Sequence, residues 1–389
     1  MSWRPLLEGD DAAPAHEAIQ AIATDLAAHA IDRPDLDEGH AGQALFAAYL
    51  AAAGHPAEAD RATNALEQAL SGLDRTGGPW LLDGLSGIAW TAAHLSGELI
   101  ELDEETAAGL DGLAARILAA EPWPFMWEYV AGLVGLGVYA IERGAVDLQA
   151  RAIDHLQWLA ETSAAGATWR SPSPPDAADL EAGGYHNLGL AHGVVGVIGF
   201  LARAVEAGAD GHALLADAVR WLLAHDSGDP AGRFPYWVGR PPPPGRRDGW
   251  CYGDTAVAIA IVRAGRALGE PAWIERGRAV ALDAARRVPD LDLHPSLCHG
   301  TIGRAHIFNR LAQATGSDEL GEAARAWYGQ TLARRRAGSG VGGYRGESAL
   351  ADHGLLLGAT GIGLGLLAAV SPVEPAWDRA LLLDLQTYG

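Results

Sequence analysis

Only two cysteines occur among the 389 residues, and both stand in similar surroundings. Cys251 lies in "DGWCYGD" (248–254), and Cys298 lies in "SLCHGTIG" (296–303). Each cysteine is followed two residues later by a glycine, and Cys298 is followed directly by His299. Thiolate and imidazole groups are strong metal ligands, so this repetition points to metal chemistry at these two positions.

His192, in "LGLAHGV", precedes a glycine in the same way as His299. If these glycines lie at one place in the fold, Cys251, Cys298, His299 and His192 converge, although they span more than 100 residues. Two thiolates and one imidazole suit a single Zn²⁺, and three protein ligands leave the fourth tetrahedral position open, as in catalytic zinc sites. Two alternatives remain open, a Cys251–Cys298 disulfide and a pair of buried, inert thiols.

The motif Gly-x-x-Gly followed by an apolar stretch recurs seven times in the chain. Its first glycines are Gly39, Gly84, Gly132, Gly193, Gly253, Gly300 and Gly358. The fifth copy has Ala256 where the second glycine belongs. In the second copy Leu85, Ile88 and Leu95 fall on one face of a helix, so each motif is expected to open a helix.

More polar, amphipathic segments separate these copies, for example 57–72, 146–160 and 317–335. An apolar helix belongs inside a fold and a helix with a charged face belongs outside. Seven such pairs predict an all-α fold, an α/α toroid of seven helical hairpins in one domain (1–389), with the Gly-led helices inside and their glycines around one mouth. An open solenoid is the alternative. The closed ring is favoured because neither terminal pair carries an obvious polar capping face.

Two long intervals between repeats contain Pro- and Gly-rich insertions, at about 161–191 and 226–250. Loops of this length inside a compact domain are usually functional. We expect them to form lids or walls near the mouth, with plain surface insertions as the alternative.

Composition excludes several classes of function. A net charge of −21 argues against nucleic acid as the partner, because phosphate binding needs a basic surface. The sequence has no run of about 18 apolar residues, so we expect no membrane insertion. The N-terminal stretch lacks a secretion signal and cysteines are scarce, which favours the reducing cytoplasm.

Three short motifs and the repeats together resemble one known family. "WCYG" (250–253), "CHG" (298–300), "AHG" (191–193) and the seven Gly-led helices are similar to those of the LanC-like lanthipeptide cyclases, from about Asp37 to the end of the chain. A chain that starts at Met1 with no dehydratase region ahead looks like the stand-alone cyclase of a class I system.

The resemblance implies an α/α toroid that holds one zinc ion through Cys251, Cys298 and His299, with the fourth position open to water or a substrate thiolate. It also implies an enzyme, a lanthionine synthetase cyclase. Such enzymes add cysteine thiols of a dehydrated precursor peptide to dehydroalanine or dehydrobutyrine, which forms the (methyl)lanthionine thioether rings of lantibiotics. The implied partners are this peptide and a biosynthetic complex with a dehydratase and a transporter, through which a cytoplasmic cyclase can be membrane-associated.

The resemblance also assigns roles to further residues. His192, the histidine of "AHG", is expected to be the acid/base. Arg247, four residues before Cys251, is expected to orient the substrate or stabilise charge, and the neighbouring Arg246 competes for this role. Tyr252 corresponds to the tyrosine that follows the zinc cysteine.

One position departs from the family pattern. "WEYVAGLVG" has Glu128 where the family commonly has an aspartate. The carboxylate is kept on a longer side chain, so Glu128 is expected either to hold His192 or the peptide, or to be an ordinary helix-end glutamate.

Two other functions remain open at this stage. One is a LanC-like enzyme that adds glutathione or another small thiol to dehydroamino acids in proteins. The other is a non-catalytic, zinc-containing scaffold that binds a dehydratase or a leader peptide.

Overall fold

The computed structural model describes residues 2–97, 102–172, 184–241, 248–287, 294–346 and 352–386. The chain divides into two compact units. Unit 1 comprises Met1–Ala114 and Leu293–Gly389, and unit 2 comprises Ala115–Asp292.

A helix begins directly after the first glycine of every repeat, as predicted. These helices are α2 (His40–Ala52), α4 (Leu85–Leu95), α6 (Leu133–Arg143), α8 (Val194–Glu206), α10 (Asp254–Ala267), α12 (Thr301–Thr315) and α14 (Ala359–Val370). In each of them the glycine is the N-cap residue, and most of the helix is buried. The prediction of Gly-led inner helices is therefore confirmed.

The second glycine of the motif is required by close packing against the preceding turn. A Cβ atom at Gly87, Gly303 or Gly361 would collide with a backbone carbonyl oxygen six residues earlier in the chain. The fifth copy escapes this rule with Ala256, and its preceding turn follows a different path. Gly253 has a φ of +96°, a left-handed value that favours glycine, whereas the other six N-cap glycines have negative φ.

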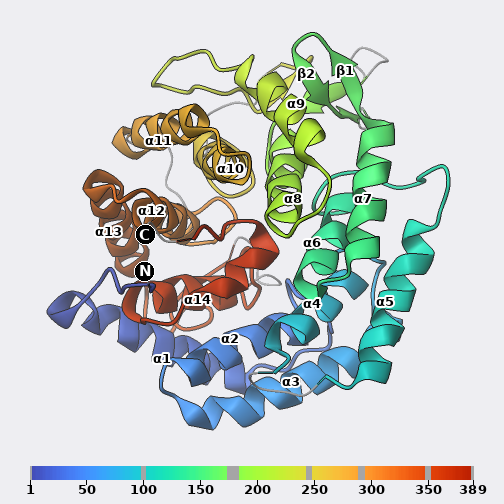
Figure 1. The fold of residues 1–389 in the computed structure, drawn as a ribbon. Helices are drawn as coiled ribbons and strands as arrows, with labels where there is room; N and C mark the ends of the chain where they lie inside the picture. The colour runs from blue at the N-terminus through green and yellow to red at the C-terminus, as the bar shows by residue number, and fades with distance from the viewer. Residues whose placement is uncertain are drawn as a thin grey trace. The chain divides into compact units, whose positions relative to one another are not determined.

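Unit 1 is built from helical pairs. Its other helices are α1 (Ala13–Ala28), α3 (Ala59–Ser71), α5 (Glu104–Leu118, which runs across the boundary into unit 2) and α13 (Asp318–Ala333), with the short 3₁₀ turns η1 (Gly9–Asp11), η2 (Pro56–Glu58), η3 (Leu73–Arg75) and η5 (Ala376–Leu381). α2 pairs with α3, α12 with α13, and α14 with the N-terminal helix α1 (Figure 1). The Gly-led helices are neighbours in the order α12, α14, α2, α4. The first and last helices of the chain are therefore packed together.

Unit 2 repeats the same arrangement. α6 pairs with α7 (Val146–Leu159), α8 with α9 (His212–Leu223), and α10 with α11 (Pro271–Arg286). The Gly-led helices α6, α8 and α10 are successive neighbours. Alternation of a buried helix with an amphipathic one along the sequence thus corresponds to these helical pairs.

The two insertions contribute short strands to unit 2, where the sequence suggested only loops. β1 (Glu161–Ser163) and β2 (Gly166–Thr168) form a hairpin. β3 (Arg170–Ser171), β4 (Tyr185–Asn187) and β5 (Trp237–Val238) form an antiparallel sheet in the order β3-β4-β5. Since β4 comes from the first insertion and β5 from the second, the sheet joins the two. Residues 173–183 and 242–247 of the insertions lie outside the described residues.

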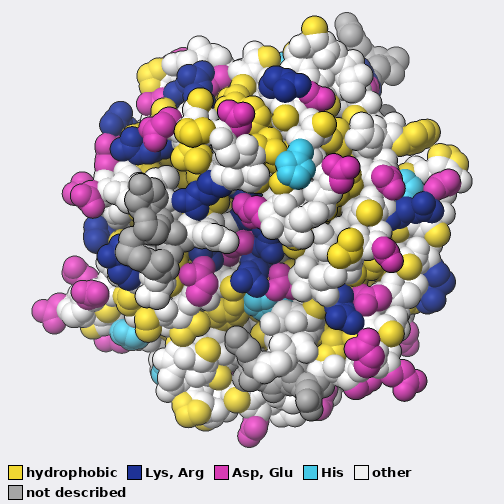
Figure 2. Space-filling model, in the orientation of Figure 1, with side chains coloured by type: hydrophobic (Ala, Val, Ile, Leu, Met, Phe, Trp, Pro, Cys, Tyr) yellow, Lys and Arg dark blue, Asp and Glu magenta, His cyan; other side chains and the backbone are white. Residues whose placement is uncertain are grey.

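Among the described residues, no helix combines the length and apolar character that crossing a bilayer requires. Figure 2 shows carboxylate side chains scattered over the drawn face among basic and apolar ones.

Candidate functional site

Backbone hydrogen bonds link the turns that precede the three Gly-led helices of unit 2. The amide of Val130, before α6, donates to the carbonyl of Ala191, before α8, at 3.3 Å. The amides of Leu190 and Ala191 both donate to the carbonyl of Cys251, before α10, at 2.9 and 3.3 Å. The candidate residues of unit 2 therefore lie on three successive, mutually bonded turns.

Glu128 contacts His192. The imidazole Nδ1 lies 3.0 Å from Oε2 of the carboxylate. The same carboxylate accepts hydrogen bonds from the amides of Val130 at 2.8 Å and Ala131 at 2.7 Å, so its burial (2% exposed) is compensated. The His192 side chain is 48% exposed. With Nδ1 facing the carboxylate, Nε2 is the ring nitrogen available to a substrate.

The electrostatic surroundings raise the pKa of His192 above its ordinary value. Burial by itself lowers this pKa, but the hydrogen bond and negative charge of Glu128 outweigh it, and the thiol of Cys251 adds a smaller contribution in the same direction. A larger share of the imidazole is therefore protonated near neutral pH than for an ordinary histidine.

Tyr252 is held by Asn187, a residue that the sequence analysis did not single out. Asn187 Nδ2 donates to the Tyr252 hydroxyl oxygen at 2.9 Å, and Asn187 Oδ1 accepts from the amide of Gly189 at 2.8 Å. Burial raises the pKa of Tyr252 to about 12, and the bond from Asn187 opposes this only in part. The phenol thus keeps its proton and can donate it in a hydrogen bond.

In unit 1, Cys298 and His299 occupy the turn before α12. Gly300 is the extended N-cap residue and the helix begins at Thr301, so the adjacent pair precedes the helix, as expected. The amide of Cys298 donates to the carbonyl of Leu356, in the turn before α14, at 2.9 Å. The unit 1 turns are thus linked in the same manner as those of unit 2.

Asp37 occupies the place in the first repeat that Cys251 and Cys298 occupy in the fifth and sixth. Its Oδ1 accepts a hydrogen bond from the amide of Leu356 at 2.8 Å. Burial raises the pKa of Asp37 to about 7, assisted by the nearby carboxylate of Glu38. Asp37 was not a candidate from the sequence, because a single carboxylate before a glycine is not distinctive.

Cys251 of unit 2 and Cys298 and His299 of unit 1 supply two sulfurs and one imidazole, donor types that could hold a metal ion. Cys251 and His299 are partly accessible, and Cys298 is buried at 9% exposure. The described residues contain no disulfide. Arg247 and its competitor Arg246 lie outside the described residues.

The class of protein is thus a mostly helical repeat protein. It carries thiol and imidazole side chains directly before helices that begin after a glycine. Residues 30–382 match the family described as "Lanthionine synthetase C-like protein", and the chain therefore belongs to that family. Membership bears out the resemblance found in the sequence and the predicted enzyme class, a lanthionine synthetase cyclase.

A solved structure of "Nisin cyclase" is similar to this chain with a TM-score of 0.74. The match covers 95% of this chain and 97% of that one, at 20% sequence identity. Together with the helical pairs described above, it confirms the predicted α/α-toroid fold class.

Proposed function

We propose that this protein is a zinc-dependent lanthipeptide cyclase. It joins a cysteine thiol of a dehydrated precursor peptide to the β-carbon of a dehydroalanine or dehydrobutyrine in the same peptide, and thereby forms a (methyl)lanthionine ring. Family membership supports the reaction class. The observation that carries the proposal to particular residues is the His192–Glu128 pair, one bonded turn away from Cys251.

Cys251, Cys298 and His299 would hold the zinc ion, because soft sulfur and imidazole donors suit this metal. When bound, zinc supplies a Lewis acid that lowers the pKa of an incoming thiol and so favours the nucleophilic thiolate. The remaining steps belong to the protein's own side chains.

His192 is assigned as the acid that completes the addition. As sulfur bonds to the β-carbon, the π electrons move toward the carbonyl and the α-carbon must then take up a proton. A histidine with a raised pKa, whose Nδ1 is held by Glu128, is well suited to deliver this proton from Nε2. The thiol proton passes to solvent, and a proton from solvent later returns the imidazole to its starting state, so the addition is balanced.

Tyr252 is assigned to the developing negative charge on the carbonyl oxygen of the dehydro residue. Its hydroxyl accepts from Asn187, which directs the remaining O–H toward another acceptor. Because its pKa is about 12, the phenol donates a hydrogen bond without losing its proton. Arg247 remains the predicted cationic group for the same charge.

The proposal includes a cytoplasmic location, which the scarcity of cysteines supports. It also includes the dehydrated peptide as the direct partner, with a dehydratase and a transporter as members of a larger complex. Co-purification from the native host with an affinity-tagged cyclase tests the complex.

The test is to incubate the protein with a dehydrated precursor peptide, alkylate the remaining thiols and determine masses. Ring formation does not change the peptide mass, so each ring appears as one alkyl group fewer. Cys298→Ala serves as the matched control and is expected to show full alkylation and loss of zinc.

Each alternative has a distinct outcome in the same assay. A small-thiol transferase would add the mass of glutathione when glutathione is supplied, and a scaffold would leave every thiol open to alkylation. If the correct precursor is still fully alkylated after incubation with intact, zinc-loaded protein, the cyclase proposal is wrong.

A further inference from the structure

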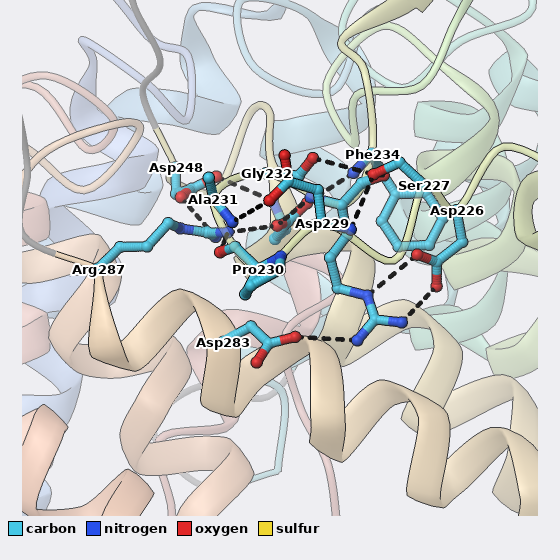
Figure 3. Close-up of polar contacts among 12 residues, drawn as sticks. Asp226, Ser227, Asp229, Pro230, Ala231, Gly232, Phe234, Asp248, Asp283 and Arg287 are labelled. Atoms are coloured by element: carbon cyan, nitrogen blue, oxygen red, sulfur yellow. Dashed lines mark hydrogen bonds and ion pairs between the residues drawn. The ribbon is translucent and has the colours of Figure 1, made fainter.

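One arginine bridges two carboxylates that flank Cys251. Arg287, which follows α11, forms ion pairs with Asp248 at 2.8 Å and with Asp254 at 2.7 Å (Figure 3). Asp248 lies three residues before Cys251 and Asp254 lies three residues after it. Both ends of the turn that carries the thiol are thereby tied to the same guanidinium.

The turn between these two carboxylates is closed by internal bonds. The amide of Asp254 donates to Oδ1 of Asp248 at 3.0 Å. The amide of Gly249 donates to the carbonyl of Tyr252 at 2.9 Å, and Gly253 has the left-handed φ of +96°. Cys251 thus lies in the middle of a tight turn whose backbone has little freedom.

Other repeats close the same turn in a different way. In α4, α12 and α14 the amide of the first helical residue donates to a backbone carbonyl seven residues earlier, as in Thr301 to His294 at 2.9 Å. In α10 the corresponding amide, that of Asp254, donates to a carboxylate. The turn before α10, which carries Cys251, is therefore closed by a hydrogen bond to a carboxylate.

The network continues into the second insertion. The Asp254 carboxylate also accepts hydrogen bonds from the amides of Arg233 at 3.0 Å and Phe234 at 3.1 Å. The Arg233 side chain binds Asp226 through two bonds of 3.0 Å and binds Asp283 of α11 at 2.9 Å (Figure 3). The segment 226–234 is thereby fastened to the Cys251 turn and to α11.

These charges are withdrawn from solvent. The side chain of Asp254 is fully buried, that of Asp248 is 5% exposed and that of Arg287 is 15% exposed. A buried ion pair adds little stability compared with apolar packing, whereas a fully satisfied buried network makes its surroundings rigid. Rigidity is what a ligand-bearing turn needs, because metal affinity depends on preformed ligand geometry.

We propose that Arg287, Asp248 and Asp254 form a clamp that positions Cys251 as a metal ligand. The inference rests on the proposed function, since it assigns these residues to the same metal site. The three are positioning residues, because they act on Cys251 through the turn that carries it.

The test compares the zinc affinity of purified variants by competition with a chromophoric chelator, and records the thiolate-to-cobalt absorption of the Co²⁺-substituted proteins. Arg287→Gln is expected to weaken zinc binding by roughly 10–100-fold, the usual effect of losing a group that orients a ligand. The cobalt absorption should change with it. Arg287→Lys, which keeps the charge, should restore part of the affinity.

Asp248→Asn provides a second route if Arg287→Gln fails to fold. Asparagine keeps an oxygen for the amide of Asp254 but loses the charge that pairs with Arg287. The expected result is again weaker zinc binding with a changed cobalt spectrum.

Arg263→Gln is the matched control. Arg263 is a buried arginine of α10 that pairs with Glu206 at 3.3 Å, away from the Cys251 turn. Its loss should lower stability and leave zinc affinity and the cobalt spectrum unchanged.

Unaltered zinc affinity and cobalt spectra in folded Arg287→Gln and Asp248→Asn would overturn the clamp, as would an equal loss of affinity in Arg263→Gln. If the unaltered protein itself bound no zinc, the metal site of the proposed function would fail and the clamp with it. The two failures are distinguishable, because only the first leaves the unaltered protein with zinc.

Discussion

Glu128 combines a structural and a chemical contact in one carboxylate. It accepts hydrogen bonds from two backbone amides of its own turn, and it contacts the imidazole of His192 on the neighbouring turn. The longer side chain spans the distance to the imidazole while the backbone contacts hold it in place. The departure from the aspartate common in the family is thus accommodated locally.

Replacing Glu128 with glutamine should lower the pKa of His192, because the charge that raises it is removed. We expect the cyclisation rate near neutral pH to fall by about 100-fold, the usual scale of acid–base catalysis. An NMR titration of the His192 ring protons measures the pKa change directly.

Glu161→Gln is the control for this titration, since it alters another carboxylate–imidazole pair of unit 2, with His186 at 3.0 Å. It should leave the pKa of His192 unchanged. An unchanged His192 pKa in Glu128→Gln would contradict the assignment.

Asp37 should make stability depend on pH. Its folded-state pKa of about 7 lies above the ordinary 3.8, so the stabilisation from its protonated form is complete below about pH 3.8 and is lost as pH rises through 7. The asparagine side chain of the Asp37→Asn variant cannot ionise. Since one pKa unit corresponds to about 1.4 kcal/mol, we expect its unfolding free energy, relative to the unaltered protein, to be higher at pH 8 than at pH 5 by at least about 1 kcal/mol.

Urea unfolding at the two pH values measures this difference. Asp103→Asn is a suitable comparison, because hydrogen bonds from Thr106 lower the pKa of that exposed carboxylate and it does not titrate between pH 5 and 8. Equal pH dependence in both variants would refute the role of Asp37.

Candidate residues that stand one or two places before a motif glycine could be found from the sequence. Residues that reach the site only through contacts in space could not. Cys251, Cys298 and His299 stand at fixed offsets from the motif. Asn187 and Arg287 lie in a strand and after a helix that no local pattern connects to the site. Their contacts depend on how the insertions and α11 pack, which is a tertiary property.

At the scale of elements, the sequence predicted the helix starts correctly because glycine has a physical function there. The strands of the insertions were missed. They are two or three residues long, too short for an alternating pattern to be visible, and β4 and β5 pair across about 50 residues of chain.

Gly303→Ala should strongly destabilise the protein, because its Cβ would strike the carbonyl of Leu297 and the turn that carries Cys298 would have to move. A loss of about 3 kcal/mol is expected from such overpacking. Thermal unfolding measures it. Gly329→Ala, in the exposed face of α13 where a Cβ meets nothing within 4 Å, should instead add up to about 1 kcal/mol of helix propensity.

Equal effects of these two substitutions would show that the motif glycine is needed for something other than space. Ala256 is the natural test of the same idea. It is tolerated in the fifth repeat, where the preceding turn takes the different path set by Gly253.

At the scale of the whole molecule, the seven copies of the glycine motif, alternating with amphipathic segments, were sufficient to predict the fold class. The motif glycines meet one physical demand, the close approach of a helix start to its preceding turn. At 20% identity to the nisin cyclase structure the fold is still the same.

Zinc should stabilise the folded protein by mass action, because a ligand that binds only the folded state raises the free energy of unfolding. At a zinc concentration 1,000-fold above the dissociation constant, the gain is about 4 kcal/mol. A thermal shift assay on protein stripped with a chelator and then titrated with zinc measures this gain. Cys251→Ala and Cys298→Ala should each lose most of the gain, and a full gain in either variant would contradict the ligand set.

The main-chain bonds between successive turns leave the side chains at these positions free to differ. The residue two places before each glycine is Asp37, Leu82, Val130, Ala191, Cys251, Cys298 or Leu356. Several of these residues contribute only backbone carbonyls and amides to the links between turns. A substitution at this position therefore changes the side chain that is presented and leaves the main-chain bonds between the turns in place. The same position is a natural one for installing other metal donors by design.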